Sequence, residues 1–197
     1  MTTWTSKGPI AALALLILSA CEGGQGAVLF DGLSAPSIKG QRAKPLSQAK
    51  LAGGAVTVIA PPGFCIDGTS VQKQFALMAR CDVLGVPQAA ADAPLAFITV
   101  SVLPAGPDAG LPAVEQIAAA NGLTNVTDPQ VNQGRLIFRA KGAAPIDGVS
   151  YTHWRGTARM GGQMIGVALY GPKNGRALSG EGRSIVSSVM SRSQSNS

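Results

Sequence analysis

The chain has 197 residues, a length that suits one domain with a leader, and its formal charge is +6. Hydrophobic residues make up 46% and charged residues 13%, which excludes a wholly disordered chain. Glycine and proline are frequent, at 25 and 13 residues, and this favours strands and turns over long helices. The lysines and arginines are scattered without interleaved aromatic residues, so the composition argues against nucleic acid as a partner.

The first twenty residues have the pattern of an export signal. Lys7 provides a basic start, and an uninterrupted apolar run follows from Ile10 to Leu18. That run has the length of a signal core and falls well short of the roughly 20 residues needed to span a bilayer. The next residues, Leu18-Ser19-Ala20-Cys21, resemble the bacterial lipobox, in which a leucine and two small residues precede a cysteine.

The lipobox resemblance implies cleavage before Cys21, a diacylglycerol group on its thiol and, in many bacteria, acylation of the new amino group. Two or more acyl chains anchor a protein stably, whereas one binds only marginally. We therefore predict a signal peptide over residues 1–20 and a lipid-anchored protein on the periplasmic side of a membrane. Glu22 follows the cysteine in place of the aspartate that favours the inner membrane in enterobacteria, so the outer membrane is preferred. An ordinary signal peptide with a coincidental cysteine is the alternative.

If Cys21 carries lipid, Cys65 and Cys81 remain as a pair. Two cysteines in an oxidising compartment usually form a disulfide, and a loop of about 16 residues is worth about 3 kcal/mol in the chain-entropy model. Their spacing matches no common metal-binding pattern. A structural disulfide is the prediction, and a reactive or metal-bound thiol is the alternative.

Residues 21–54 have the composition of a flexible basic tether. They are rich in small and polar residues, and no acid occurs between Asp31 and Asp67, whereas four basic residues do: Lys39, Arg42, Lys44 and Lys50. This arm is either a solvated linker or a contact with anionic headgroups. We predict a lipidated tether over 21–54, a single domain over 55–191 and a polar tail over 192–197.

Within the domain, apolar and β-branched runs predict strands at 55–60, 75–81, 95–103 and 135–139, and a hairpin of 149–160 with 163–170. A first helix is expected from Pro112 to Asn121-Gly122, and Ser179 is expected to cap a second, with Glu181 in its first turn. This order predicts an α+β domain, with an antiparallel sheet of about five to six strands and two helices packed on one face.

The element order resembles the PsbP-like fold. In that fold an early strand ends in a proline and glycine turn, here Pro61-Pro62-Gly63, a helix crosses midway and an Ile/Val and Ser helix closes the chain. The resemblance covers about residues 54–190 and implies a mostly non-enzymatic periplasmic accessory protein. The run Gly63-Phe64-Cys65-Ile66-Asp67 also resembles small envelope proteins of alphaproteobacteria.

His153 is the only histidine, and on a strand it shares one face with Tyr151 and Arg155. These three residues form a ligand-binding face, or else a solvent-facing sheet surface or the surroundings of a hydrogen-bonded, partly buried histidine. A soft Cu(I) site from His153, Met160 and Met164 is conceivable, although packing is the favoured role of both methionines. The sequence has no Gly-x-Ser-x-Gly run, nucleotide cradle or calcium loop, so we predict no catalytic residue, no metal site and no cofactor.

These observations favour a non-enzymatic envelope lipoprotein that binds a protein or polysaccharide partner. The second hypothesis is a small-ligand or metal carrier that uses the Tyr151, His153 and Arg155 face. The third is a hydrolase, which requires His153 to meet a serine and a carboxylate.

Overall fold

The computed structural model describes residues 44–87, 92–106 and 108–196. The predictions for the signal peptide, for Cys21 and for the tether as far as residue 43 lie outside the described residues. The elements are, in order, β1 (Pro45–Leu46), β2 (Gln48–Leu51), the 3-10 helix η2 (Ala52–Gly54), β3 (Val56–Ile59), β4 (Phe64–Asp67), β5 (Phe75–Arg80), β6 (Phe97–Pro104), α1 (Val114–Ala120), β7 (Thr124–Asn132), β8 (Arg135–Lys141), β9 (Thr152–Met160), β10 (Gln163–Tyr170), the 3-10 helix η4 (Arg176–Leu178), α2 (Gly180–Arg192) and β11 (Gln194–Ser195).

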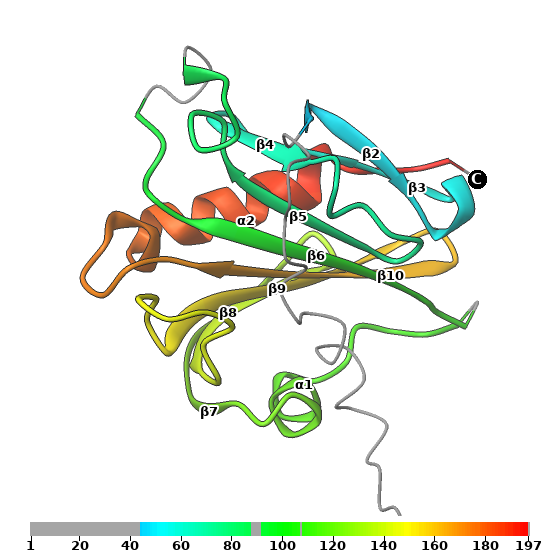
Figure 1. The fold of residues 1–197 in the computed structure, drawn as a ribbon. Helices are drawn as coiled ribbons and strands as arrows, with labels where there is room; N and C mark the ends of the chain where they lie inside the picture. Colours follow the sequence, from blue (N-terminus) through cyan, green and yellow to red (C-terminus); the bar gives the residue numbers. More distant parts are fainter. Residues whose placement is uncertain (1–43, 88–91, 107, 197) are drawn as a thin grey trace, which may run out of the picture.

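Eight of the strands form one antiparallel sheet, in the order β1-β4-β5-β6-β10-β9-β8-β7 (Figure 1). The α+β class agrees with the prediction, but the sheet has eight strands and not five or six. Three strands of this sheet were not predicted, and one of them, β4, has buried Phe64 and Ile66 but only four residues. The other two, β1 and β7, carry little hydrophobic signal. β7 is exposed along almost its whole length, and β1 has two residues, so backbone pairing to a neighbour forms both strands without a periodic apolar face.

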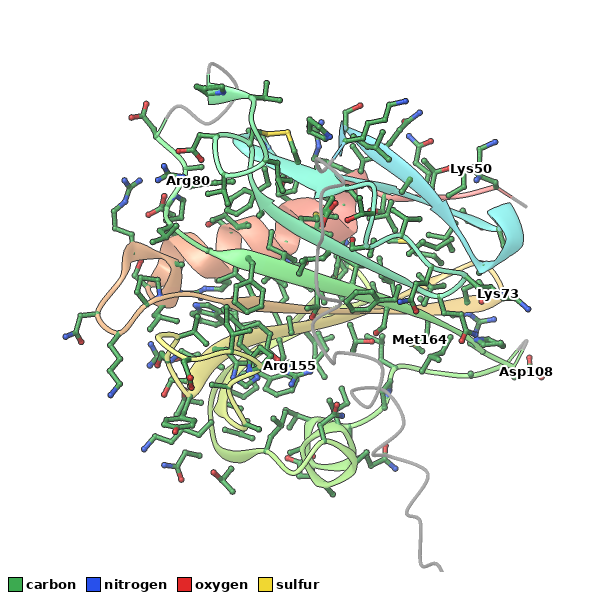
Figure 2. All side chains as sticks on the ribbon, in the orientation of Figure 1. Lys50, Lys73, Arg80, Asp108, Arg155 and Met164 are labelled. Atoms are coloured by element: carbon green, nitrogen blue, oxygen red, sulfur yellow. A yellow bond between two sulfur atoms is a disulfide. The ribbon has the colours of Figure 1, made fainter. Side chains whose placement is uncertain are left out.

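A second, three-stranded sheet has the order β11-β3-β2. Leu51 in β2 and Val56 in β3 are fully buried in it. The fold therefore begins at β1, about ten residues before the predicted boundary, and Lys50 belongs to the domain (Figure 2). The predicted polar tail is also part of the fold, because β11 pairs with β3 and the Asn196 side chain donates 2.7 Å hydrogen bonds to Gly54 O and Thr57 Oγ1.

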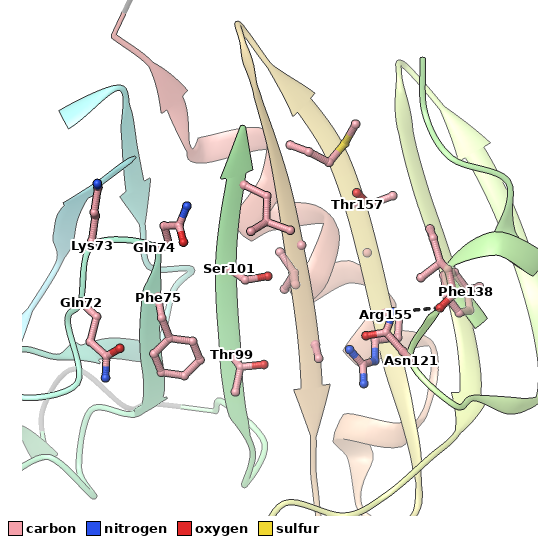
Figure 3. A pocket seen from close by; sticks show the side chains of 17 residues that line it. Gln72, Lys73, Gln74, Phe75, Thr99, Ser101, Asn121, Phe138, Arg155 and Thr157 are labelled. Atoms are coloured by element: carbon pink, nitrogen blue, oxygen red, sulfur yellow. Dashed lines mark hydrogen bonds between the residues drawn. The ribbon is translucent and has the colours of Figure 1, made fainter. Parts of the chain in front are cut away.

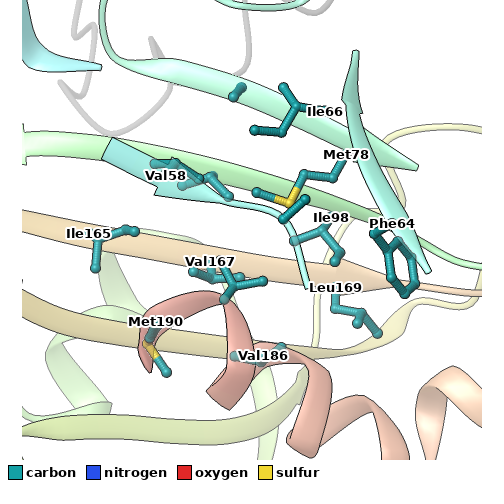
Figure 4. Close-up of a cluster of buried hydrophobic side chains, with 14 of the residues drawn as sticks. Val58, Phe64, Ile66, Met78, Ile98, Ile165, Val167, Leu169, Val186 and Met190 are labelled. Carbon is teal, nitrogen blue, oxygen red and sulfur yellow. The ribbon is translucent and has the colours of Figure 1, made fainter. Parts of the chain in front are cut away.

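The main core lies between the large sheet and a layer made of α2 and the small sheet. Strand alternation points the largest side chains of β6 and β10 into this space. α2 adds its apolar stripe, and Val58 of the small sheet completes the layer (Figure 4). The buried side chains at its centre are Ile98, Val100, Val102, Ile165, Val167, Leu169, Val186, Val189 and Met190.

The two helices lie on opposite faces of the large sheet, which differs from the predicted arrangement on one face. α1 begins at Val114, two residues after Pro112, and packs through Ala118 against Phe138 and its neighbours on β8. Phe138 alternates with Ile137, which faces the main core. β8 therefore presents an apolar face to α1, made of Leu136, Phe138 and Ala140, and contributes only Ile137 to the main core on the other face.

α2 approaches the sheet closely at its first turn. Ser179 Oγ accepts a 3.2 Å hydrogen bond from the Glu181 backbone N–H, so the predicted cap is present. The Trp154 indole N–H donates to the Ser179 carbonyl at 2.9 Å. A Cβ on Gly182 would lie 1.9 Å from the Ala177 carbonyl oxygen and 2.6 Å from Trp154 Cδ1. Only glycine permits this contact.

We expect Gly182→Ala to lower the free energy of unfolding by at least roughly 1–3 kcal/mol, because the added methyl group has no room. Gly162→Ala is the matched control, since nothing lies within 4 Å of its added Cβ and its φ is not in the left-handed region. The control is expected to change stability by less than about 0.5 kcal/mol. Urea denaturation measures both, and equal stability of the two variants would contradict the packing described for α2.

Candidate functional site

A groove of about 420 Å³ lies on the face of the large sheet that carries α1 (Figure 3). One wall is the segment 72–75, which leads into β5 and includes Phe75. The other wall is formed by Ile117 of α1, by Asn121 at the C-terminal end of that helix, and by Phe138 of β8. The floor consists of β6, β10 and β9.

The groove exists because the central strands carry small side chains on this face. Thr99 and Ser101 of β6 point into it, and Gly166 and Ala168 lie opposite them on β10. The alternate residues of the same strands are the large aliphatic side chains of the main core. A sheet with large residues on both faces here would fill this volume.

Three side chains at one end of the groove form a hydrogen-bonded group. Arg155 Nε donates to His153 Nε2 at 2.8 Å, and Arg155 Nη2 donates to the Tyr170 hydroxyl at 3.3 Å. Tyr170 also stacks on the His153 ring, with 4.5 Å between ring centroids, and on Phe97 at 5.1 Å. These contacts hold the guanidinium at the floor, where Arg155 lines the groove.

Arg155 carries a positive charge that no carboxylate balances within the described residues. The ion pairs found there are Arg80–Asp82, Arg139–Asp128 and Arg176–Glu181. Burial lowers the pKa of Arg155, and the neighbouring Tyr170 opposes that shift. The guanidinium stays charged at neutral pH because an arginine side chain does not deprotonate in proteins.

His153 is fully buried and neutral. Burial, with a contribution from the Arg155 charge, lowers its pKa from 6.5 to about 4, although the hydrogen bond to the Tyr151 carbonyl acts in the opposite direction. Nδ1 lies 2.9 Å from that carbonyl, and Nε2 accepts from Arg155. This pattern assigns the proton to Nδ1 and engages both ring nitrogens, so His153 positions Arg155 and has no nitrogen left for a metal or a serine.

Of the predicted face, the structure brings His153 and Arg155 together but not the Tyr151 side chain. Tyr151 precedes β9, is 61% exposed and contributes its carbonyl oxygen alone. Tyr170, from the neighbouring strand β10, provides the phenol. Spacing along one strand cannot identify a residue from the adjacent strand, so the sequence did not reveal this partner.

The two methionines do not form a metal site with His153. Met160 is buried in the main core, whereas Met164 lines the groove on the other face. No group of three or more histidine, cysteine, aspartate or glutamate residues within the described part of the chain is arranged to hold a metal ion.

Cys65 and Cys81 lie within disulfide distance and are bonded in the structure, with Cα atoms 4.9 Å apart. The bond connects β4 to the turn that follows β5, and these two strands are neighbours in the large sheet.

None of the helices in the described ranges is long and apolar enough to cross a membrane.

No protein-family model matches the chain, and no curated protein matches it either. Among solved structures, it is similar to the Ran-binding protein Mog1p of Saccharomyces cerevisiae, with a TM-score of 0.47 and 16% identity over 78% of this chain and 96% of that one. It is also similar to a cyanobacterial PsbP from Synechocystis, with a TM-score of 0.43 and 10% identity over 83% of this chain and 99% of that one.

A protein from Bacteroides thetaiotaomicron is also similar, with a TM-score of 0.39 and 11% identity over 80% of this chain and 50% of that one. One of these three structures is thus a PsbP. Likenesses of this extent establish no family and no function.

The buried histidine makes a pH-dependent contribution to stability. Because its pKa is lower in the folded chain than the usual 6.5, the unfolded chain binds the proton more readily. The stabilisation is complete above pH 6.5 and is lost as the pH falls from 6.5 towards 4, by about 3 kcal/mol in all. The single imidazole NMR signal is expected to titrate near pH 4 in the folded protein, and a midpoint near 6.5 would contradict its burial.

Proposed function

We propose that this chain is a lipid-anchored, non-enzymatic binding module of the bacterial envelope whose groove binds ligands that carry a carboxylate on an apolar body. The observation that carries the proposal is the unbalanced guanidinium of Arg155 on the floor of that groove. A buried charge without a partner is unfavourable, and a bound anion relieves that cost. Arginine is suited to this role because its planar group receives a carboxylate through two parallel hydrogen bonds.

The walls fit an apolar body better than a polar one. Phe75, Ile117 and Phe138 stand on either side of Arg155, and Leu103 and Met164 continue the lining. Methionine adapts to ligands of different shape because its side chain is unbranched and flexible. A volume of about 420 Å³ lies within the range of small-ligand sites in proteins.

A binding role is favoured over catalysis by the state of His153. Both of its ring nitrogens are hydrogen-bonded, to Tyr151 O and to Arg155, and its pKa is far below that of a base active at neutral pH. The hydrolase hypothesis needs a histidine nitrogen that can receive a proton from a serine, and His153 has no ring nitrogen free for that role.

The lipobox motif supports an anchor at Cys21 and a place on the periplasmic side of the membrane, with the outer membrane preferred. The Cys65–Cys81 bond suits the oxidising conditions of that compartment. In this proposal the anchor keeps the domain near its partners in the envelope, a protein or polysaccharide assembly, while the groove holds a smaller anionic ligand.

Calorimetric titration with three probes of equal chain length tests the groove. Octanoate is expected to bind at least tenfold more tightly than octanol, because the carboxylate pairs with Arg155, and octylamine is expected to bind least. Arg155→Met is expected to remove the preference for octanoate over octanol. Lys73→Met removes a charge at the groove wall and is expected to change octanoate affinity less than threefold.

The circular dichroism spectra and melting temperatures of both variants establish that they fold. Equal affinity of the unaltered protein for octanoate and octanol would contradict the proposal. A folded Arg155→Met variant that keeps the preference for octanoate would also contradict it.

A further inference from the structure

A second groove, of about 400 Å³, lies on the opposite face of the large sheet, between α2 and the strands β7 and β8. Its lining differs in chemistry from that of the first groove. Ile137 is the one apolar residue, and no acidic residue takes part. The others are two arginines, two amides and four serines: Arg135, Arg183, Gln130, Asn132, Ser184, Ser187, Ser188 and Ser191.

The two arginines of this groove have no carboxylate partner within the described residues. Arg183 stacks over the Trp154 ring, 5.5 Å from its centroid, which fixes the guanidinium without using its N–H donors. Arg135 donates a 3.3 Å hydrogen bond to the neutral side chain of Gln133. Arg139, which lies on β8 like Arg135, differs from these two arginines because the Asp128 carboxylate lies 3.4 Å from its guanidinium and balances its charge.

The serines repeat along α2 at positions 184, 187, 188 and 191, so they form one hydroxyl-bearing stripe on the helix. The hydroxyls of Ser187 and Ser188 make no hydrogen bond within the described part of the chain, and the amides of Gln130 and Asn132 stand across the groove. Hydroxyls and amides both donate and accept hydrogen bonds, as the hydroxyl groups of a sugar require. The arginines add a preference for negative charge.

We propose that this groove binds an acidic oligosaccharide, with Arg135 and Arg183 pairing with acidic substituents and the α2 serines bonding to sugar hydroxyls. The site is separate from the groove of Arg155 and lies on the other face of the sheet. It gives the envelope module a way to hold a polysaccharide while the first groove is occupied.

Titration of the full chain with a short oligogalacturonate, followed by calorimetry, tests this site. Its methyl ester is the matched neutral probe, because it keeps the hydroxyls and removes the charges. The acidic form is expected to bind at least tenfold more tightly than the ester. The double variant Arg135→Gln with Arg183→Gln is expected to lose at least tenfold in affinity for the acidic form, and Ser187→Ala is expected to lose less.

Lys50→Gln with Lys173→Gln is the control variant, since both lysines are exposed and lie outside the groove lining, and the same net charge is removed. It is expected to bind within twofold of the unaltered protein. Arg155→Met is expected to bind the oligosaccharide normally, so failure of the first groove and failure of this one are distinguishable. Arg135→Gln alone provides a second variant that leaves the Trp154 contact in place.

Three results would overturn the proposal. Equal affinity loss in the two double variants would indicate non-specific attraction between charges. Equal binding of the acid and its ester would remove the role of the arginines. Inorganic phosphate that competes as well as the oligosaccharide, mole for mole, would show that sugar hydroxyls are not recognised.

Discussion

The hydrogen bond between His153 and Arg155 is the interaction on which the account of the main groove depends. It requires a neutral imidazole, and burial provides that neutrality by lowering the pKa of His153 to about 4. The same bond holds the guanidinium at the groove floor, and Tyr170 supports it from the next strand. His153 and Tyr170 are neutral, so they accept hydrogen bonds from Arg155 but do not balance its charge. The guanidinium therefore remains a fixed positive group that faces a largely apolar space.

The distribution of side-chain size across β6 and β10 determines where that space lies. Large aliphatic residues point to α2 and the small sheet and form the core, whereas threonine, serine, glycine and alanine point to the other side. α1 then covers only the β7 and β8 end of that side. The result is that β6 and β10 are covered on the face of the main core and partly open on the other face, where they form a rigid floor of the kind on which small-ligand sites occur.

The sequence predicted the parts of the fold that have a strong period. The central strands, the β9–β10 hairpin and the capped α2 all lie close to their expected positions, because their apolar residues repeat at the spacing of a strand or a helix. It did not predict the beginning of the domain, since the alternation of β2 covers only four residues in a stretch rich in basic and small side chains. It also missed β7 and β11, which are held by backbone pairing to their neighbours. The alternation of Leu136, Phe138 and Ala140 along β8 was the signal for an apolar face that α1 covers, on the side of the sheet away from the main core.

The candidate site was predictable only in part. His153 and Arg155 were placed on one face by simple alternation, and the structure shows them in contact. The role of Tyr170 depends on the pairing of β9 with β10, and the missing carboxylate depends on where every acidic residue of the described chain lies. The small residues of β6 and β10 were visible in the sequence as Thr99, Ser101, Gly166 and Ala168, and they indicate a groove once the neighbouring strands are known.

Whether Arg155 is held by His153 and receives the ligand carboxylate is best measured through the NMR signal of the Arg155 Nε–Hε group, assigned by its loss in Arg155→Met. The hydrogen bond to His153 protects this proton from exchange with water, so the signal is expected to be visible at neutral pH. Addition of octanoate is expected to shift it at a lower concentration than any other arginine signal, whereas octanol, which binds at least tenfold more weakly, is expected to shift it only at a correspondingly higher concentration. A signal that does not respond to octanoate, or that responds only together with the exposed arginines, would contradict this role of Arg155.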